Sequence, residues 1–131
     1  MMHFITDEQI EVAKQQTQYS GEVFHEHNDC IRIAYEWLDA QVIIRRGSDR
    51  IFQLKSYIER WAGRYVSIAD VEVAAQLHPN ISGTYPRFNL SVRFTEPSVS
   101  RLHLISEANT QDYRIRHNAS LYTYHEPFDY Q

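Results

Sequence analysis

The chain has few of the residues on which several protein classes depend. Its 131 residues include one cysteine and four glycines. A single cysteine excludes an internal disulfide and makes a reducing cytoplasm the simplest location. No apolar run approaches the roughly 20 residues that a membrane-spanning helix needs, so we expect no membrane partner. The opening MMHFITDEQI lacks a basic region followed by an apolar run, so we also expect no signal peptide.

Motifs of catalysis and cofactor binding are missing as well. The sequence contains no phosphate-binding loop, no Gly-x-Ser-x-Gly and no internal repeat. The scarcity of glycine argues against the glycine-built loops that often approach substrates. We therefore expect a protein that is not an enzyme and needs no cofactor.

What the chain does have is an apolar core and an uneven charge. Hydrophobic residues make up 43% of it, which favours one folded domain, with room for a small appended subdomain. Residues 1–40 hold eight acids and two bases, a local charge of −6, whereas residues 41–131 hold nine acids and eleven bases, a local charge of +2. Such a division bears on binding partners, since the acidic end would repel nucleic acid.

Local patterns predict four helices. Thr6-Asp7-Glu8-Gln9 is a capping box, which starts a helix over about 7–18. Apolar residues at helical spacing predict a second helix over about 28–42 and a third from 51 to 61, ended by Gly63. A Ser-x-x-acid start at Ser67 predicts a fourth helix, apolar on most sides and therefore buried, that runs to about residue 77.

The rest of the chain favours short strands, which makes the expected fold class α+β. Strict alternation over 86–94 predicts a strand, although Pro86 is also compatible with a helix start. Residues 65–66 could form a very short strand, and Val99, Leu102 and Ile105 predict a short helix. The segments 112–117 and 120–125 could pair as a hairpin.

The stretch HEHNDC, residues 25–30, has three interpretations. His25 and His27 could bind zinc together with a third ligand, Cys30, Asp29 or a distant histidine such as His3 or His78, but no second His or Cys pair follows at ligand spacing. Cys30 could be an activated thiolate at a helix start, although nothing supplies an oxyanion hole. The preferred interpretation is a helix entrance, with Asn28 as N-cap and Asp29 in the first turn. We therefore predict no metal site.

The order of elements between Arg50 and Arg101 resembles a winged helix-turn-helix. Residues 51–61 stand for its first helix, and Tyr65-Val66-Ser67-Ile68-Ala69-Asp70-Val71 for a strand and second helix; either 89–94 or 97–102 could be the recognition helix. The resemblance implies an N-terminal helical pair followed by a winged-helix-like domain with a small antiparallel sheet, and contact with double-stranded DNA. The long connection after Leu77 departs from the family's short turn. The residues of the right type for base edges and phosphates are Arg45, Arg46, Arg87, Asn89, Arg93, Ser98, Ser100 and Arg101.

Aromatic residues could form a second binding surface. Tyrosine and tryptophan are enriched at protein interfaces, and tyrosine can also stack on bases, although the simplest use of C-terminal rings is to cover the core. The candidate partner-binding residues are Trp37, Tyr113, Tyr122 and Tyr124.

Residues 24–41, FHEHNDCIRIAYEWLDAQ, resemble a segment of small accessory proteins of lambda-like temperate phages and their prophages in enteric bacteria. The resemblance implies a portable acidic helical module over 1–41, a winged-helix-like module over 42–131, and a location in the cytoplasm of a bacterial host. The expected function is therefore non-enzymatic DNA binding. The alternative is a protein-binding inhibitor or adaptor that blocks a host factor through the acidic helices and aromatics. A homodimer is compatible with the sequence.

Overall fold

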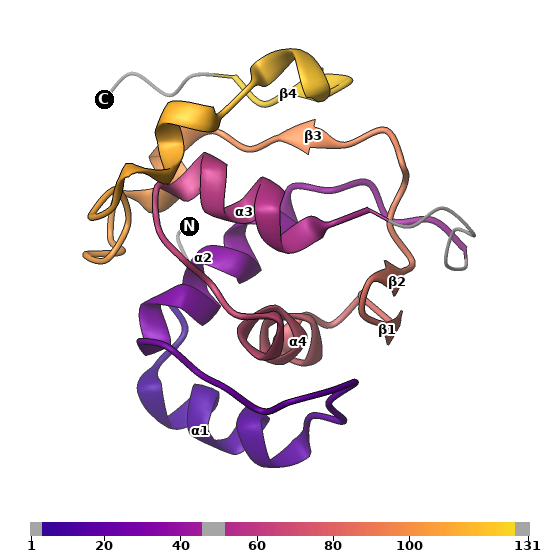
Figure 1. Cartoon of the computed structure of the whole chain (residues 1–131). Helices are drawn as coiled ribbons and strands as arrows, with labels where there is room; N and C mark the ends of the chain where they lie inside the picture. Colours follow the sequence, from indigo (N-terminus) through magenta and orange to yellow (C-terminus); the bar gives the residue numbers. More distant parts are fainter. Residues whose placement is uncertain (1–3, 46–51, 128–131) are drawn as a thin grey trace.

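The computed structural model describes residues 4–45 and 52–127, and confirms the α+β class. Four α-helices come first, and short strands and 3-10 turns follow (Figure 1). The elements in chain order are α1 (Asp7–Gln16), α2 (Asn28–Asp39), α3 (Leu54–Ala62), α4 (Ile68–Leu77), β1 (Gly83–Thr84), β2 (Arg87–Phe88), β3 (Thr95–Glu96), η1 (Val99–Leu102), η2 (Asp112–Arg116), η3 (Ala119–Leu121) and β4 (Tyr124–His125). No described helix has the length and apolar character that crossing a membrane would require.

The predicted helices form because their ends are fixed locally. Thr6 and Gln9 make the reciprocal capping box of α1, and Ser67 and Asp70 make that of α4. Gly63 ends α3 with φ of 64°, a conformation that L residues with side chains rarely adopt. The third helix begins at Leu54, later than the apolar pattern predicted.

Helix α4 lies at the centre of the helical part. It packs against α2 on one side and against α1 on the other (Figure 1). Its residues from Ala69 to Ala75 are all buried, as the nearly uniform apolar pattern predicts. Helix α1 buries only Ile10 and Ala13, so it depends on this contact with α4 for its place in the fold.

The strands are shorter than the alternation predicted. Within 86–94 only β2 is a strand, and it pairs antiparallel with β1. Leu90 then bridges to Ile43, which joins residues 42–44 to 89–91 in a short antiparallel ribbon. Residues 65–66 form no strand.

Beyond residue 95 the structure corrects the predicted elements. The helix expected at Val99 is a four-residue 3-10 turn, η1. The hairpin predicted from 112–117 and 120–125 is wrong: these segments form η2 and η3, and β4 pairs in parallel with β3. Neither 89–94 nor 97–102 is an α-helix, so neither is a recognition helix.

One hydrophobic cluster contains residues from both predicted modules. Trp37 from 1–41 and Trp61 from 42–131 are fully buried in it. Their indole N–H groups donate to the Tyr122 hydroxyl and to the Pro97 carbonyl, each at 3.0 Å. Phe94 sits among the rings of Trp37, Phe52 and Tyr57 with centroids 5.1–5.3 Å apart, in the edge-to-face arrangement that aromatic pairs prefer.

Candidate functional site

The HEHNDC stretch enters helix α2, as the preferred interpretation had it, but the cap lies one residue earlier than predicted. Nδ1 of His27 accepts the amide of Asp29 at 2.9 Å. His25 turns away from it, and its Nδ1 is 2.8 Å from Oδ1 of the fully buried Asp70. His27 therefore caps α2, and His25 contacts α4.

The alternative interpretations of this stretch find no support in the structure. Within residues 4–45 and 52–127, no three His, Cys, Asp or Glu side chains group in a way that could hold a metal ion. His78 pairs with Asp39 at 2.8 Å, and His3 lies outside the described residues. Burial raises the pKa of the Cys30 thiol to about 12, so at neutral pH the side chain is a protonated, inert part of the core.

Arg101, one of the predicted DNA contacts, forms ion pairs with three carboxylates of the same chain. Its guanidinium forms a two-pronged pair with Glu126, with Nε–Oε1 at 2.7 Å and Nη2–Oε2 at 2.8 Å. Nη1 also donates to Glu36 at 2.9 Å and to Asp39 at 3.0 Å. These hydrogen bonds, first of all those that Arg101 donates to Glu126, raise the pKa of Arg101 against the effect of burial. Arg101 therefore joins α2, η1 and the C-terminal segment, and these bonds would have to break before it could contact a phosphate.

Three further predicted contacts have structural partners. Asn89 is buried, accepts the amide of Ser82 at 2.7 Å and donates to the carbonyl of Asn80 at 3.0 Å. Ser98 caps η1, and its hydroxyl lies 2.9 Å from that of Ser100. The polar atoms of Asn89, Ser98 and Ser100 therefore hold local turns.

The remaining predicted arginines share one region, which we call the arginine edge: Arg45, Arg87 and Arg93. All three are exposed, and within the described residues none forms an ion pair. The ribbon places them: Ile44 N–H donates to Asn89 O at 2.9 Å and Ser91 N–H to Val42 O at 2.8 Å. Arg45 and Arg87 thus lie near one end of the ribbon and Arg93 near the other. Arg46 lies outside the described residues.

The charge around the arginine edge differs from that of the whole chain. Most acidic side chains of the described part are paired internally, such as Asp7 and Asp29 with Arg32, and Glu26 and Glu107 with Arg64. Each of these two arginines is shared by two carboxylates, so each group keeps a net charge of −1. Arg45, Arg87 and Arg93 form no such pair with a described residue, so each keeps its full positive charge in a chain whose net charge is −4.

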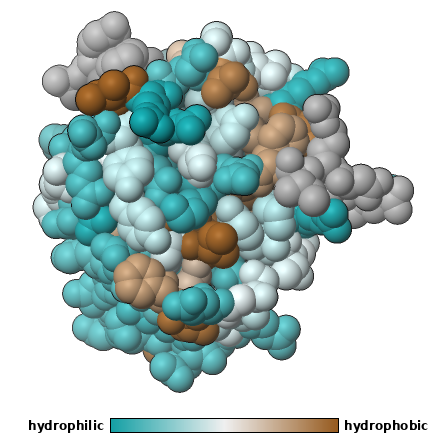
Figure 2. Space-filling view, in the orientation of Figure 1, coloured by the Kyte–Doolittle hydropathy of each residue, from teal (hydrophilic) through white to brown (hydrophobic). Residues whose placement is uncertain are grey.

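The predicted partner-binding aromatics divide into buried and accessible rings. Trp37 and Tyr122 are buried against each other, so they belong to the core and not to an interface. Tyr124 is 47% exposed and Tyr113 is half-buried. On the face drawn in Figure 2, hydrophobic residues lie in separate small patches among hydrophilic ones.

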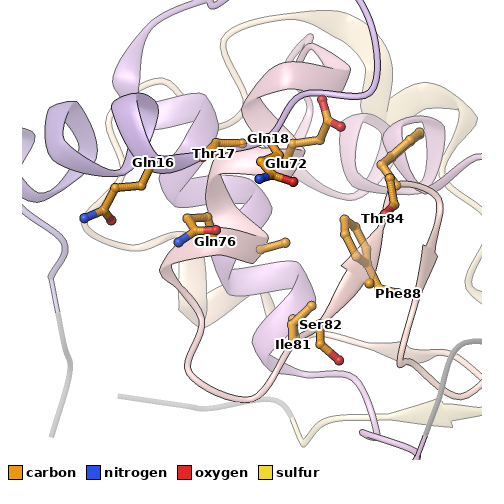
Figure 3. Close-up of a pocket in the computed structure, with 12 residues that line it drawn as sticks. Gln16, Thr17, Gln18, Glu72, Gln76, Ile81, Ser82, Thr84 and Phe88 are labelled. Carbon is orange, nitrogen blue, oxygen red and sulfur yellow. The ribbon is translucent and has the colours of Figure 1, made fainter.

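Two cavities were not predicted from the sequence. One, of about 520 Å³, is lined by Tyr113, Ile115, Arg60 and Arg116 among others, and neither arginine forms an ion pair with a described residue. The other, of about 430 Å³, lies between the end of α1, helix α4 and the β1–β2 hairpin. We call it the amide pocket after its glutamines. Its lining residues are Gln16, Thr17, Gln18, Glu72, Ala75, Gln76, Ile81, Ser82, Gly83, Thr84, Tyr85 and Phe88 (Figure 3).

Glu72 is the one charged residue among those that line the amide pocket. Glu72 is 5% exposed. Its Oε2 accepts the amide of Ser20 at 2.9 Å, while Oε1 is buried without a hydrogen bond from any described residue. In Figure 3 Glu72 lies beside Gln18, with Phe88, Ser82 and Ile81 across the pocket. The sequence did contain a signal for it, namely an acid within the apolar run of α4, IADVEVAAQL.

Comparison of the chain with protein-family models, curated proteins and solved structures found no match.

Proposed function

We propose that this chain is a non-enzymatic protein that binds double-stranded DNA through the arginine edge. The observation that carries the proposal is the contrast among its arginines. Arg101 is paired with three carboxylates, whereas Arg45, Arg87 and Arg93 are exposed at one ribbon without an ion pair to a described residue. An unpaired guanidinium can take a phosphate without first breaking an internal bond.

The proposed contact differs from that of a winged helix. Neither candidate for the recognition helix, 89–94 or 97–102, is an α-helix, and α4, the second helix of the expected motif, is buried against α1 and α2. In the proposal, the β1–β2 hairpin and the ribbon beside it make the DNA contact that a recognition helix makes in a winged helix. Six residues of fully extended chain span at most about 20 Å, which is the upper bound on the separation of Arg87 and Arg93 and compares with a major groove about 12 Å wide.

The test measures how duplex binding depends on salt, by fluorescence anisotropy of a labelled duplex. With three phosphate contacts, the slope of log K against log salt is about −2.7, so raising salt from about 50 to 200 mM weakens binding about 40-fold. In Arg87→Ala/Arg93→Ala the slope should fall in magnitude by about two. If the wild type does not bind DNA at the lower salt, the proposal is contradicted.

Arg60→Ala/Arg116→Ala is the matched control. This variant removes two positive charges from the cavity lined by Arg60 and Arg116, away from the arginine edge, and should bind DNA like the wild type. If both double variants weaken binding equally, net charge and not the arginine edge is responsible.

A further inference from the structure

We propose that the amide pocket binds a small organic cation, a primary ammonium or guanidinium group on a short apolar stem, with Glu72 as its charged partner. The proposal is independent of DNA binding. It starts from the buried Oε1 of Glu72, which accepts no hydrogen bond from a described residue. A buried acceptor without a donor destabilises the protein, and a donor that reaches it relieves that cost.

The lining of the amide pocket selects the sign of the ligand. Glu72 is its one charged residue, and the pocket contains no basic side chain that could neutralise it. The amide and hydroxyl groups of Gln16, Gln76 and Thr84 offer further acceptors for the N–H groups of a cation. An anion would be repelled by the carboxylate and would find no basic side chain among the lining residues.

The rest of the lining suits an apolar stem. Tyr85 and Phe88 stand edge to face with centroids 6.0 Å apart, and Ile81 and Ala75 complete the apolar part. Aromatic faces attract ammonium and guanidinium groups as well as alkyl chains. A cavity of about 430 Å³ is within the usual range for small-molecule sites.

Access to Oε1 requires a small rearrangement, because this oxygen is covered by its neighbours. Gln18 and Gln76 are exposed, long and unbranched, and both line the amide pocket. Rotation of such side chains takes picoseconds to nanoseconds on a protein surface. Movement of these side chains is therefore the rearrangement that the proposal invokes.

Titration with butylguanidinium and butylammonium, followed by amide chemical shifts in NMR, tests the proposal. The backbone N–H of Ser20 reports directly, because it donates to Glu72, and that of Thr84 reports from the opposite wall. Fragments of this size should bind with Kd of about 1 mM. Butan-1-ol and butyrate are the matched neutral and anionic probes, and they should bind at least tenfold more weakly. Equal shifts with butan-1-ol, or none with either cation, overturn the proposal.

Glu72→Gln tests the role of the carboxylate. The amide keeps an oxygen for Ser20 N–H and nearly the same shape, so the chain should stay folded while affinity for butylguanidinium falls at least tenfold. Glu8→Gln removes the same charge from an exposed position outside the amide pocket and should bind like the wild type. Undiminished binding by Glu72→Gln overturns the proposal.

Gln76→Lys supplies the cation from the chain itself. Residue 76 lies one helical turn beyond Glu72, the spacing at which an acid and a lysine pair on a helix. The affinity of this variant for butylguanidinium should be at least tenfold lower than that of the wild type, and the variant should unfold at a higher temperature. If the variant binds the cation as well as the wild type does, the proposed position of the ligand is wrong.

Discussion

At the scale of single residues, Arg101 and Arg93 show how partners decide the role of one residue type. Arg101 is 20% exposed and contacts three carboxylates from two distant segments, whereas Arg93 is exposed without an ion pair to any described residue. Arg101→Ala should lower the free energy of unfolding by about 2–3 kcal/mol, because it leaves Glu36, Asp39 and Glu126 close together without their cation. Arg93→Ala should change it by less than about 0.5 kcal/mol. Urea unfolding at pH 7 measures both, and equal values for the two variants would contradict the network.

The same network makes a pH prediction. The hydrogen bond from Arg101 lowers the pKa of Glu126 below its usual value of 4.5, against the effect of burial. A lowered folded-state pKa stabilises the protein above the unfolded pKa, and this contribution is lost as pH falls through the folded pKa. The stability difference between wild type and Arg101→Ala should therefore be full at pH 7 and shrink below about pH 4. A difference that stays constant down to pH 3 would show that Arg101 acts through packing alone.

At the scale of elements, Gly63 joins the end of α3 to a distant turn. A Cβ at this position would lie 2.9 Å from Oδ1 of Asn109 and 3.1 Å from its Cα, in addition to the strain of φ at 64°. Asn109 N–H donates to Ala62 O at 2.7 Å, and Gln111 N–H donates to Gly63 O at 3.0 Å, so the turn cannot move away freely. Gly63→Ala should cost about 1–3 kcal/mol. Gly21→Ala, where a Cβ meets nothing within 4 Å, is the control and should change stability by less than about 0.5 kcal/mol in the same thermal unfolding experiment.

Elements differ in how far the sequence predicts them, and the reason is the range of their interactions. The four helices were predictable because caps such as Thr6 with Gln9 act within three residues. The C-terminal third was not, since its bonds are distant: Thr123 N–H donates to Phe94 O at 2.9 Å, and Arg114 donates to Trp61 O. The candidate site follows the same rule. Residue type alone made Arg87 and Arg101 equal candidates for DNA contact. The fold distinguishes them, because it places Glu36 and Glu126 beside Arg101.

At the scale of the whole molecule, the predicted boundary after residue 41 passes through a continuous core. Helix α2, from the first module, places Ile33, Trp37 and Leu38 in the same cluster as Trp61 and Val71 from the second. Gln41 bridges the two: Nε2 donates to Thr95 O, and Oε1 accepts Thr95 N–H, each at 2.9 Å. Burial of each large apolar side chain contributes about 1.5–3 kcal/mol, so a few of these residues account for as much as the whole stability of a small domain.

Separation of the two modules should therefore abolish the fold of both. A fragment of residues 42–131 exposes the faces of α3 and α4 that α2 covers, and we expect it to unfold without cooperativity and to bind a hydrophobic dye. The measurement is urea unfolding followed by tryptophan fluorescence, with Trp61 as the remaining reporter. The full chain carrying Val12→Ala, at a position that is 57% exposed on α1, is the control for a change in the N-terminal part and should keep its sharp transition. A cooperative transition in the fragment would instead support independent modules, because a domain that folds alone must bury enough apolar surface by itself to offset its conformational entropy.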